Sequence, residues 1–151
     1  MMKRLLALLL MILGCVSLVQ SKVYMVSVGI ADYPGKENDL RISDNDAKTI
    51  AKLFKATNDA SVNLLTNAEA TKSMVQGTMQ TLFAKANRDD SVVLYFSGHG
   101  TPGALVCHDG LLNYQQIFRI LKECKANRKI IIADACFSGK MRTGKQHSNK
   151  Y

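Results

Sequence analysis

Two apolar runs of strand length, each ending at a polar residue flanked by glycine, constrain the fold of this chain most. Residues 92–96 lead into SGHG at 97–100, and residues 129–133 lead into DACFSG at 134–139. Buried parallel strands have such continuous apolar sequences, and their carboxyl ends open at one edge of the sheet, where ligand and catalytic sites lie. The sequence therefore predicts that a histidine, His99, and a cysteine, Cys136, lie at the same edge.

The rest of the chain alternates strand and helix patterns. Strands are expected at 23–30 and 62–65, helices begin at Ser43, at Thr71 and after the capping residue Asn113, and a small hairpin is expected from 104 to 110. The first helix has Ile50, Leu53 and Phe54 on its inner face, and the second ends at about Asn87. This order predicts an α/β fold, a three-layer αβα sandwich with a mainly parallel sheet of about four main strands.

The two ends of the chain differ from its centre. Residues 1–21 have the layout of an export signal, because Lys3 and Arg4 precede an apolar run that is too short to span a bilayer comfortably. Residues 12–15 resemble a bacterial lipobox that would lipidate Cys15, and cleavage before Lys22 is the other outcome. Either predicts an exported protein that is periplasmic, secreted or lipid-anchored to a bacterial membrane. Residues 140–151 are expected to form a basic, disordered tail.

Charge and cysteine content exclude several classes of function. The net charge is +8, but six of the 20 basic residues lie in 1–21 and 140–151, which contain no acid. The expected domain at 22–139 is therefore nearly neutral, which argues against nucleic-acid binding. Its cysteines, Cys107, Cys124 and Cys136, are odd in number and lack the spacing of a zinc site, so we expect Cys107 and Cys124 in the core. No acidic cluster predicts a metal site, and no cofactor is expected.

The chemistry of the two strand ends is that of a nucleophile and its base. An imidazole near a thiol lowers the thiol pKa, so His99 and Cys136 form a candidate catalytic pair. A glycine that follows each residue, Gly100 after His99 and Gly139 after Cys136, allows close approach of a substrate backbone, and the N–H groups of Gly100 and Cys136 are candidate donors to an oxyanion. The alternative is a buried structural cysteine and an unrelated histidine.

These two motifs, with GIADY at 29–33 and NDA at 45–47, resemble those of the caspase-like cysteine peptidases, specifically the metacaspase and bacterial branch. The resemblance runs from about residue 23 to residue 139, and it implies that 22–139 is a caspase-like catalytic domain. It implies that the Cys136 thiol attacks the scissile carbonyl and that His99 protonates the leaving amine.

The resemblance also implies the substrate preference. In this branch, acids at the positions of Asp46 and Asp134 bind Arg or Lys on the acyl side of the cut bond, with Ser97 and Ser43 as lining residues. A carboxylate in a substrate pocket favours a cation. We therefore expect a cysteine endopeptidase that cleaves protein or peptide substrates after Arg or Lys. Ser43 and Asp46 also fit a helix capping box, which would form without any substrate.

Members of this family normally continue with further strands beside the cysteine-bearing strand, and the sequence is expected to lack these C-terminal strands. Residues 130–132 would then lie in an exposed apolar edge strand, which invites a homodimer or a partner chain along that strand. Two alternatives stay open. One is a truncated, catalytically weak caspase-like fragment, and the other is a non-enzymatic α/β interaction module.

Overall fold

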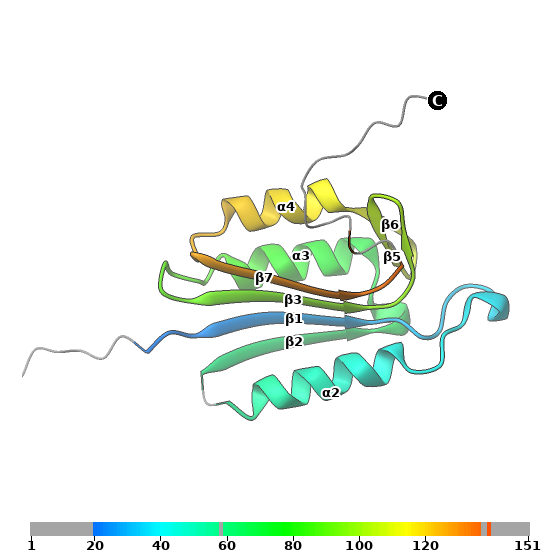
Figure 1. Ribbon diagram of the computed structural model, residues 1–151, viewed down its shortest axis with the longest axis horizontal. Helices are drawn as coiled ribbons and strands as arrows, with labels where there is room; N and C mark the ends of the chain where they lie inside the picture. The colour runs from blue at the N-terminus through cyan, green and yellow to red at the C-terminus, as the bar shows by residue number, and fades with distance from the viewer. Residues whose placement is uncertain (1–19, 58, 137–138, 140–151) are drawn as a thin grey trace, which may run out of the picture.

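The computed structural model describes residues 20–57, 59–136 and 139 (Figure 1). The expected signal, with Cys15, lies outside the described residues except for its last two positions, and the expected tail at 140–151 lies outside them altogether. Among the helices of the described part, none has the length and the apolar character that crossing a membrane requires.

Four parallel strands form the central sheet in the order β2-β1-β3-β7. They are β1 (Val23–Gly29), β2 (Ala60–Thr66), β3 (Ser91–Ser97) and β7 (Arg128–Asp134). All four run in one direction (Figure 1), so their carboxyl ends form one edge of the sheet. The strands expected from the apolar runs are confirmed, and β2 is longer than its expected core of 62–65.

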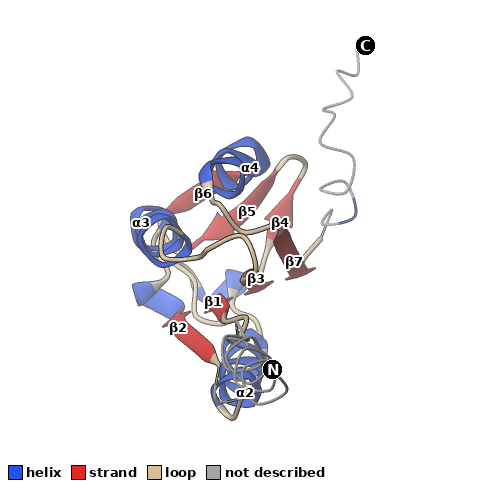
Figure 2. Cartoon of the chain, turned by 90° about the vertical axis from the view of Figure 1, so that its left-hand side faces the viewer, coloured by secondary structure: helices blue, strands red, loops and turns tan. Residues whose placement is uncertain are grey.

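Helices cover both faces of this sheet. They are α2 (Ser43–Lys55), α3 (Lys72–Phe83) and α4 (Tyr114–Glu123), together with the short 3₁₀ turns η1 (Lys36–Asn38) and η2 (Asn67–Glu69). Viewed along the strands, α2 lies on one side of the sheet, and α3 and α4 lie on the other (Figure 2). This arrangement confirms the predicted α/β sandwich.

Alternate residues of β3 supply two separate cores. Val92, Leu94 and Phe96 point into the larger one, on the side of α3 and α4. Val93 and Tyr95 point to the opposite side and pack beneath α2. Because side chains alternate along a strand, this split fixes which residues at the end of β3 face each layer.

Helix α2 packs against the sheet through small side chains rather than through Leu53. Ala47 and Ala51 are 0% and 2% exposed, whereas Leu53 is 61% exposed, so the expectation that Leu53 faces inward is wrong. The helix lies so close to β1 that a Cβ added at Gly29 would be 2.5 Å from the Ala47 Cβ. Only small residues fit at this contact, and the larger Leu53 points to solvent.

The second helix, α3, ends at Phe83 and not at about Asn87 as expected. After Phe83 the N–H groups of Lys85 and Ala86 bond to carbonyls three residues back, at 3.2 Å each, so the chain closes with tighter 3₁₀-type turns. Ala86, beyond the end of the helix, is also buried, so the sequence pattern of buried apolar residues runs past the last helical residue.

A small antiparallel sheet follows β3. It contains β4 (Gly100–Thr101), β5 (Ala104–Cys107) and β6 (Gly110–Asn113). The expected hairpin is confirmed, and so is Asn113 as the residue that caps α4. Its N–H donates to the Gln116 side chain at 3.1 Å, one half of a capping box.

Strand β7 forms one edge of the described sheet. Its register places Ile130 beside Val93 and Ile132 beside Tyr95, so both isoleucines face the side of α2. They remain 44% and 42% exposed, although the helix packs against β1, β2 and β3. The expectation of an exposed apolar edge strand is therefore confirmed for the described residues.

Candidate active site

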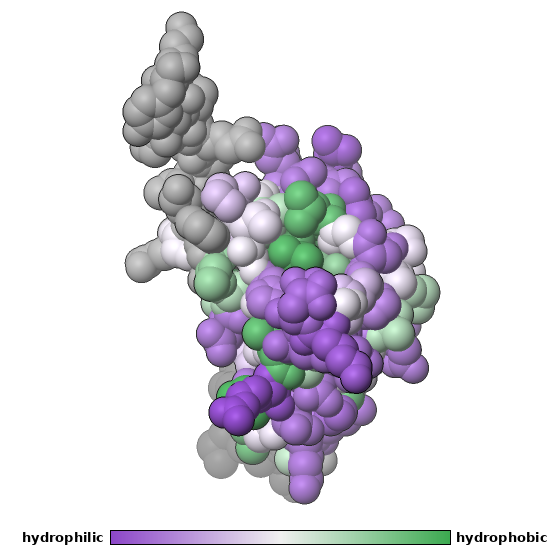
Figure 3. Space-filling model, turned by 90° about the vertical axis from the view of Figure 1, so that its right-hand side faces the viewer, coloured by the Kyte–Doolittle hydropathy of each residue, from purple (hydrophilic) through white to green (hydrophobic). Residues whose placement is uncertain are grey.

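Three strand ends lie in a row at the carboxyl edge of the sheet. Gly29 of β1 pairs with Ser97 of β3, and Ser97 pairs with Asp134 of β7. Neighbouring strands lie about 4.8 Å apart, so residues that follow these positions meet within a short distance. Figure 3 shows this side of the molecule, which is largely hydrophilic with a smaller apolar area.

His99 is half-buried, and two hydrogen bonds hold it. Its main-chain N–H donates to the hydroxyl oxygen of Tyr33 at 2.9 Å, and its ring Nε2 lies 2.7 Å from the carbonyl oxygen of Asn38. A carbonyl oxygen only accepts, so this contact assigns the ring hydrogen to Nε2. Nδ1 is then the nitrogen that can take a proton from a thiol.

Tyr33, in the loop after β1, holds His99 through a hydrogen bond to its main chain and through ring contact. Its ring centroid lies 4.8 Å from that of the imidazole, and its hydroxyl donates to the Val106 carbonyl at 3.1 Å. Burial raises the pKa of Tyr33 to about 12, with the hydrogen bond from His99 opposing the rise, so the phenol keeps its proton. Sequence reasoning missed this residue; its place in the GIADY segment was the available signal.

The loop that carries Cys136 packs against the loop that carries His99. A Cβ added at Gly100 would overlap the carbonyl oxygen of Cys136, so the residue after the histidine must be glycine for this contact to exist. The Gly98 N–H also donates to the Asp134 carbonyl at 3.2 Å. The structure thus brings the two segments together and leaves Cys136 exposed, whereas Cys107 and Cys124 are buried, as expected.

Three of the four residues expected to bind substrate gather around the phenol of Tyr95. Burial raises the pKa of Tyr95, the carboxylate of Asp46 raises it further, a hydrogen bond with Ser97 opposes this, and the carboxylate of Asp134 adds a smaller rise. Ser97 is 2% exposed, Asp46 is half-buried and Asp134 is exposed. Two carboxylates from different elements therefore both act electrostatically on this phenol.

Ser43 is not among the groups that shift the pKa of Tyr95, although it adjoins Gly29, the strand neighbour of Ser97. It is the first residue of α2 and 7% exposed, and its carbonyl oxygen sits where a Cβ at Gly29 would go. The N-cap is Ile42, whose carbonyl accepts from the Asp46 N–H at 2.9 Å, and no side chain caps the helix. The capping-box interpretation of Ser43 and Asp46 is therefore wrong, because the helix begins one residue earlier than that interpretation requires.

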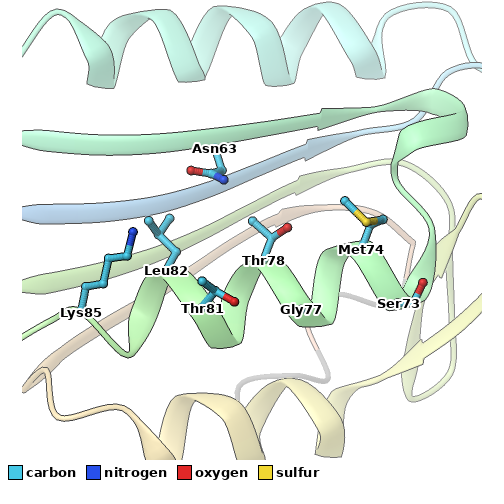
Figure 4. Close-up of a pocket in the computed structure, with 8 residues that line it drawn as sticks. All are labelled: Asn63, Ser73, Met74, Gly77, Thr78, Thr81, Leu82 and Lys85. Carbon is cyan, nitrogen blue, oxygen red and sulfur yellow. The ribbon is translucent and has the colours of Figure 1, made fainter.

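Two hollows open on the described surface. One of about 430 Å³ adjoins His99, between the loop after β1 and the small sheet. The other, of about 310 Å³, lies between β2 and α3 and is lined by hydroxyl groups, Met74 and Lys85 (Figure 4). Its lining contains no thiol or imidazole, so it offers no nucleophile. Among the described residues, no three His, Cys, Asp or Glu side chains are placed to hold a metal ion together.

Comparison with known proteins identifies the family. The family model described as the caspase domain matches residues 24–151. The chain belongs to the caspase domain family. Membership assigns this caspase domain to the cysteine peptidases, a class in which a thiol is the nucleophile.

Two further comparisons each cover part of this chain. A hemoglobinase of Schistosoma japonicum is 34% identical over 64 residues, which are 40% of this chain and 15% of the hemoglobinase. A crystal structure of a Geobacter sulfurreducens protein superposes with a TM-score of 0.67 at 18% identity, over 76% of this chain and 50% of that one. The second likeness concerns the fold alone. The chain thus spans half or less of each relative.

Proposed function

We propose that this chain is a cysteine endopeptidase that cleaves after Arg or Lys, with Cys136 as the nucleophile and His99 as its base and acid. The observation that carries the proposal is the packing of Gly100 against the main chain of Cys136. In support, Cys136 is the only exposed cysteine among the described residues, and its main chain contacts the residue that follows His99, which is half-buried and hydrogen-bonded.

The acylation step uses groups that this contact brings together. His99 Nδ1 takes the thiol proton, and the Cys136 sulfur forms a bond to the scissile carbonyl carbon. The carbonyl oxygen becomes an oxyanion that the N–H groups of Gly100 and Cys136 stabilise. When the C–N bond breaks, His99 returns the proton to the leaving amine, and a thioester remains on Cys136.

Deacylation follows the same route with water. His99 takes a proton from a water molecule, whose oxygen attacks the thioester carbonyl, and the C–S bond breaks. The proton then returns to the sulfur, which restores the thiol and releases the carboxylic acid. The Asn38 carbonyl supports both steps because it holds the imidazole in one orientation and one tautomer.

The carboxylates near Tyr95 support the preference for a cationic side chain. Asp46 and Asp134 both raise the pKa of this phenol, so their negative charges act on the same small region. A guanidinium or ammonium group that enters there is attracted by both carboxylates, whereas an acidic side chain is repelled. Ser97, bonded to the phenol, lines the same region.

Fluorogenic peptides that differ at the residue before the cut bond test this proposal. We expect cleavage of Arg and Lys peptides, none of the Asp peptide, and loss of activity in Cys136→Ala and His99→Ala. Asp46→Asn should lower kcat/KM for the Arg peptide by at least tenfold, mostly through KM. The matched control is Asp44→Asn, since Asp44 lies on the same turn of α2 but pairs with Lys48 at 2.6 Å.

Alkylation of the thiol separates the competing functions. Reaction of Cys136 with iodoacetamide that slows about tenfold or more in His99→Ala, without peptide cleavage, would favour the catalytically weak fragment. A Cys136 thiol whose reactivity is the same in both proteins would overturn the proposal in favour of a non-enzymatic module. Cleavage of the Asp peptide in preference to the Arg peptide would overturn the assigned specificity.

A further inference from the structure

The hollow beside His99 lies on the opposite side of the catalytic pair from the two carboxylates. Its lining includes Tyr33, Pro34, His99, Gly100, Thr101 and Val106. Asp46 and Asp134 do not line it. Tyr33 belongs to the large core on the side of α3 and α4, whereas Tyr95, near the carboxylates, belongs to the core beneath α2.

Two residues connect this hollow to the reacting bond. Gly100 lines it and also packs against the Cys136 main chain. His99 lines it and is the group that would protonate the leaving amine. A peptide whose acyl side chain reaches Asp46 and Asp134 must leave the site past His99, so the residue after the cut bond arrives at the mouth of this hollow.

The lining determines what kind of side chain fits. Tyr33, Pro34 and Val106 present ring and aliphatic surface, and Thr101 adds a hydroxyl. The thiol of Cys107, on the inner wall, stays neutral because burial raises its pKa to about 12, and Asp109 nearby raises it further. Asn38 and His108 add polar groups to the lining, which contains no carboxylate, Lys or Arg. Its volume of about 430 Å³ falls within the roughly 300–1,000 Å³ of ligand pockets.

We propose that this hollow is a leaving-group subsite that binds an apolar or aromatic side chain at the first residue after the cut bond. The proposal rests on the peptidase function proposed above, which decides which side of the cut bond reaches the hollow. It adds a second specificity element to that function. Cleavage would then require a basic residue before the bond and prefer a large uncharged residue after it.

Internally quenched peptides with Arg before the bond, and Phe, Leu, Gly or Asp after it, test the preference. We expect kcat/KM to be about tenfold higher for Phe than for Gly, and lowest for Asp. Thr101→Trp narrows the hollow and should bring the Phe-to-Gly ratio close to one, whereas Val106→Ala widens it. Thr78→Trp, the same change in the hollow of Figure 4, should leave the ratio unaltered.

Binding of the leaving fragment tests the subsite without any turnover. Phenylalaninamide reproduces the new amino terminus and its side chain, and glycinamide lacks the side chain. In the Cys136→Ala protein, phenylalaninamide should shift the NMR signals of Val106 and Thr101, and glycinamide should not. Thr101→Trp should remove the response.

The two measurements distinguish the failure of the subsite from the failure of the peptidase. Shifts at Val106 in the Cys136→Ala protein, together with no peptide cleavage by the wild-type protein, would support the subsite and overturn the proposed function. Cleavage after Arg with a flat preference at the next residue, or the absence of shifts with phenylalaninamide, would overturn the subsite whatever the activity. A fall in kcat/KM that is equal for all the peptides in Thr101→Trp would also overturn the subsite.

Discussion

The main-chain N–H of His99 donates to the phenol oxygen of Tyr33 at 2.9 Å, and the same phenol donates to the Val106 carbonyl at 3.1 Å. One side chain thus joins the loop after β1, the loop after β3 and strand β5. A Cβ at Gly98 would lie 2.6 Å from this phenol oxygen, so the chain passes directly over it. The position of the imidazole therefore depends on the hydroxyl of a residue whose ring also lines the hollow beside His99.

Replacing Tyr33 by Phe keeps the ring beside the imidazole and removes both hydrogen bonds. We expect a loss of about 1–3 kcal/mol in the free energy of unfolding, because two main-chain groups lose their partner. We also expect kcat to fall more than KM rises, since the imidazole loses its support but the carboxylates are intact. Urea unfolding and steady-state kinetics measure these effects. Tyr24→Phe in β1 is the control; equal behaviour of the two variants would contradict the prediction.

The contact between Gly100 and Cys136 predicts contrasting effects of two glycine substitutions. Gly100→Ala must push the Cys136 carbonyl away, and a displacement of about 1 Å can cost roughly 100-fold in rate. Gly77→Ala in α3 meets nothing within 4 Å and should be neutral or stabilise by about 0.5–1 kcal/mol. Alkylation rates of Cys136 and thermal unfolding test both. Unchanged thiol reactivity in Gly100→Ala would show that the contact does not position the nucleophile.

Asp90 makes the stability of the fold depend on pH. Its carboxylate accepts from the main-chain N–H groups of Asn87 at 2.7 Å and Lys22 at 2.8 Å, which lower its pKa. The stabilisation is therefore present above the ordinary carboxyl pKa of about 3.9 and is lost as the pH falls through the lowered folded-state pKa.

Asp90→Asn should cost about 1–2 kcal/mol of unfolding free energy at pH 7, because an amide offers one acceptor oxygen and no charge. The difference from wild type should shrink as the pH falls through the lowered folded-state pKa, where the wild-type carboxyl also becomes protonated. Urea unfolding at a series of pH values measures it, with the exposed Asp89→Asn as control. A difference that stays constant down to pH 2 would rule out this origin.

The exposed isoleucines of β7 predict association through that strand. Ile132→Lys places a charge on the apolar edge and should raise the protein concentration at which light scattering begins by several-fold. Leu53→Lys is the matched control, because Leu53 is 61% exposed on a helix and Ile132 is 42% exposed on an edge strand. Equal effects of the two changes would indicate general solubility rather than strand pairing.

The sheet and its edge could be predicted from the sequence because buried parallel strands require long apolar runs. The placing of His99 and Cys136 at one edge follows from those runs together with the chirality of the crossovers. The inward face of α2 could not be predicted, since it depends on how closely Gly29 lets the helix approach. The pattern of large apolar residues therefore predicts Leu53 on the inward face, whereas the close approach of the helix to Gly29 leaves room only for a small residue, Ala47.

Part of the candidate site could likewise be predicted from the sequence, and part could not. Asp46, Ser97 and Asp134 were identified by motif, and the structure places all three near one phenol. Tyr33 was missed because its partners are distant in sequence, and a tyrosine before Pro34 in a turn carries no periodic signal. The hollow beside His99 was also missed, because it depends on how the small sheet packs against the loop after β1.

Under the proposed specificity, the pairing of Ser97 with Asp134 would make substrate choice depend on strand alignment. A slip of β7 by one residue would turn the carboxylate of Asp134 toward α3 and α4 and bring the side chain of Ala133 or Ala135 to its place. In the described structure, β7 pairs with β3 alone, and hydrogen bonds from Arg128 to Ser91 and to the Asp89 carbonyl also hold this register. If Asp134 selects the substrate as proposed, a fault in the alignment of this edge strand would become a fault in selectivity.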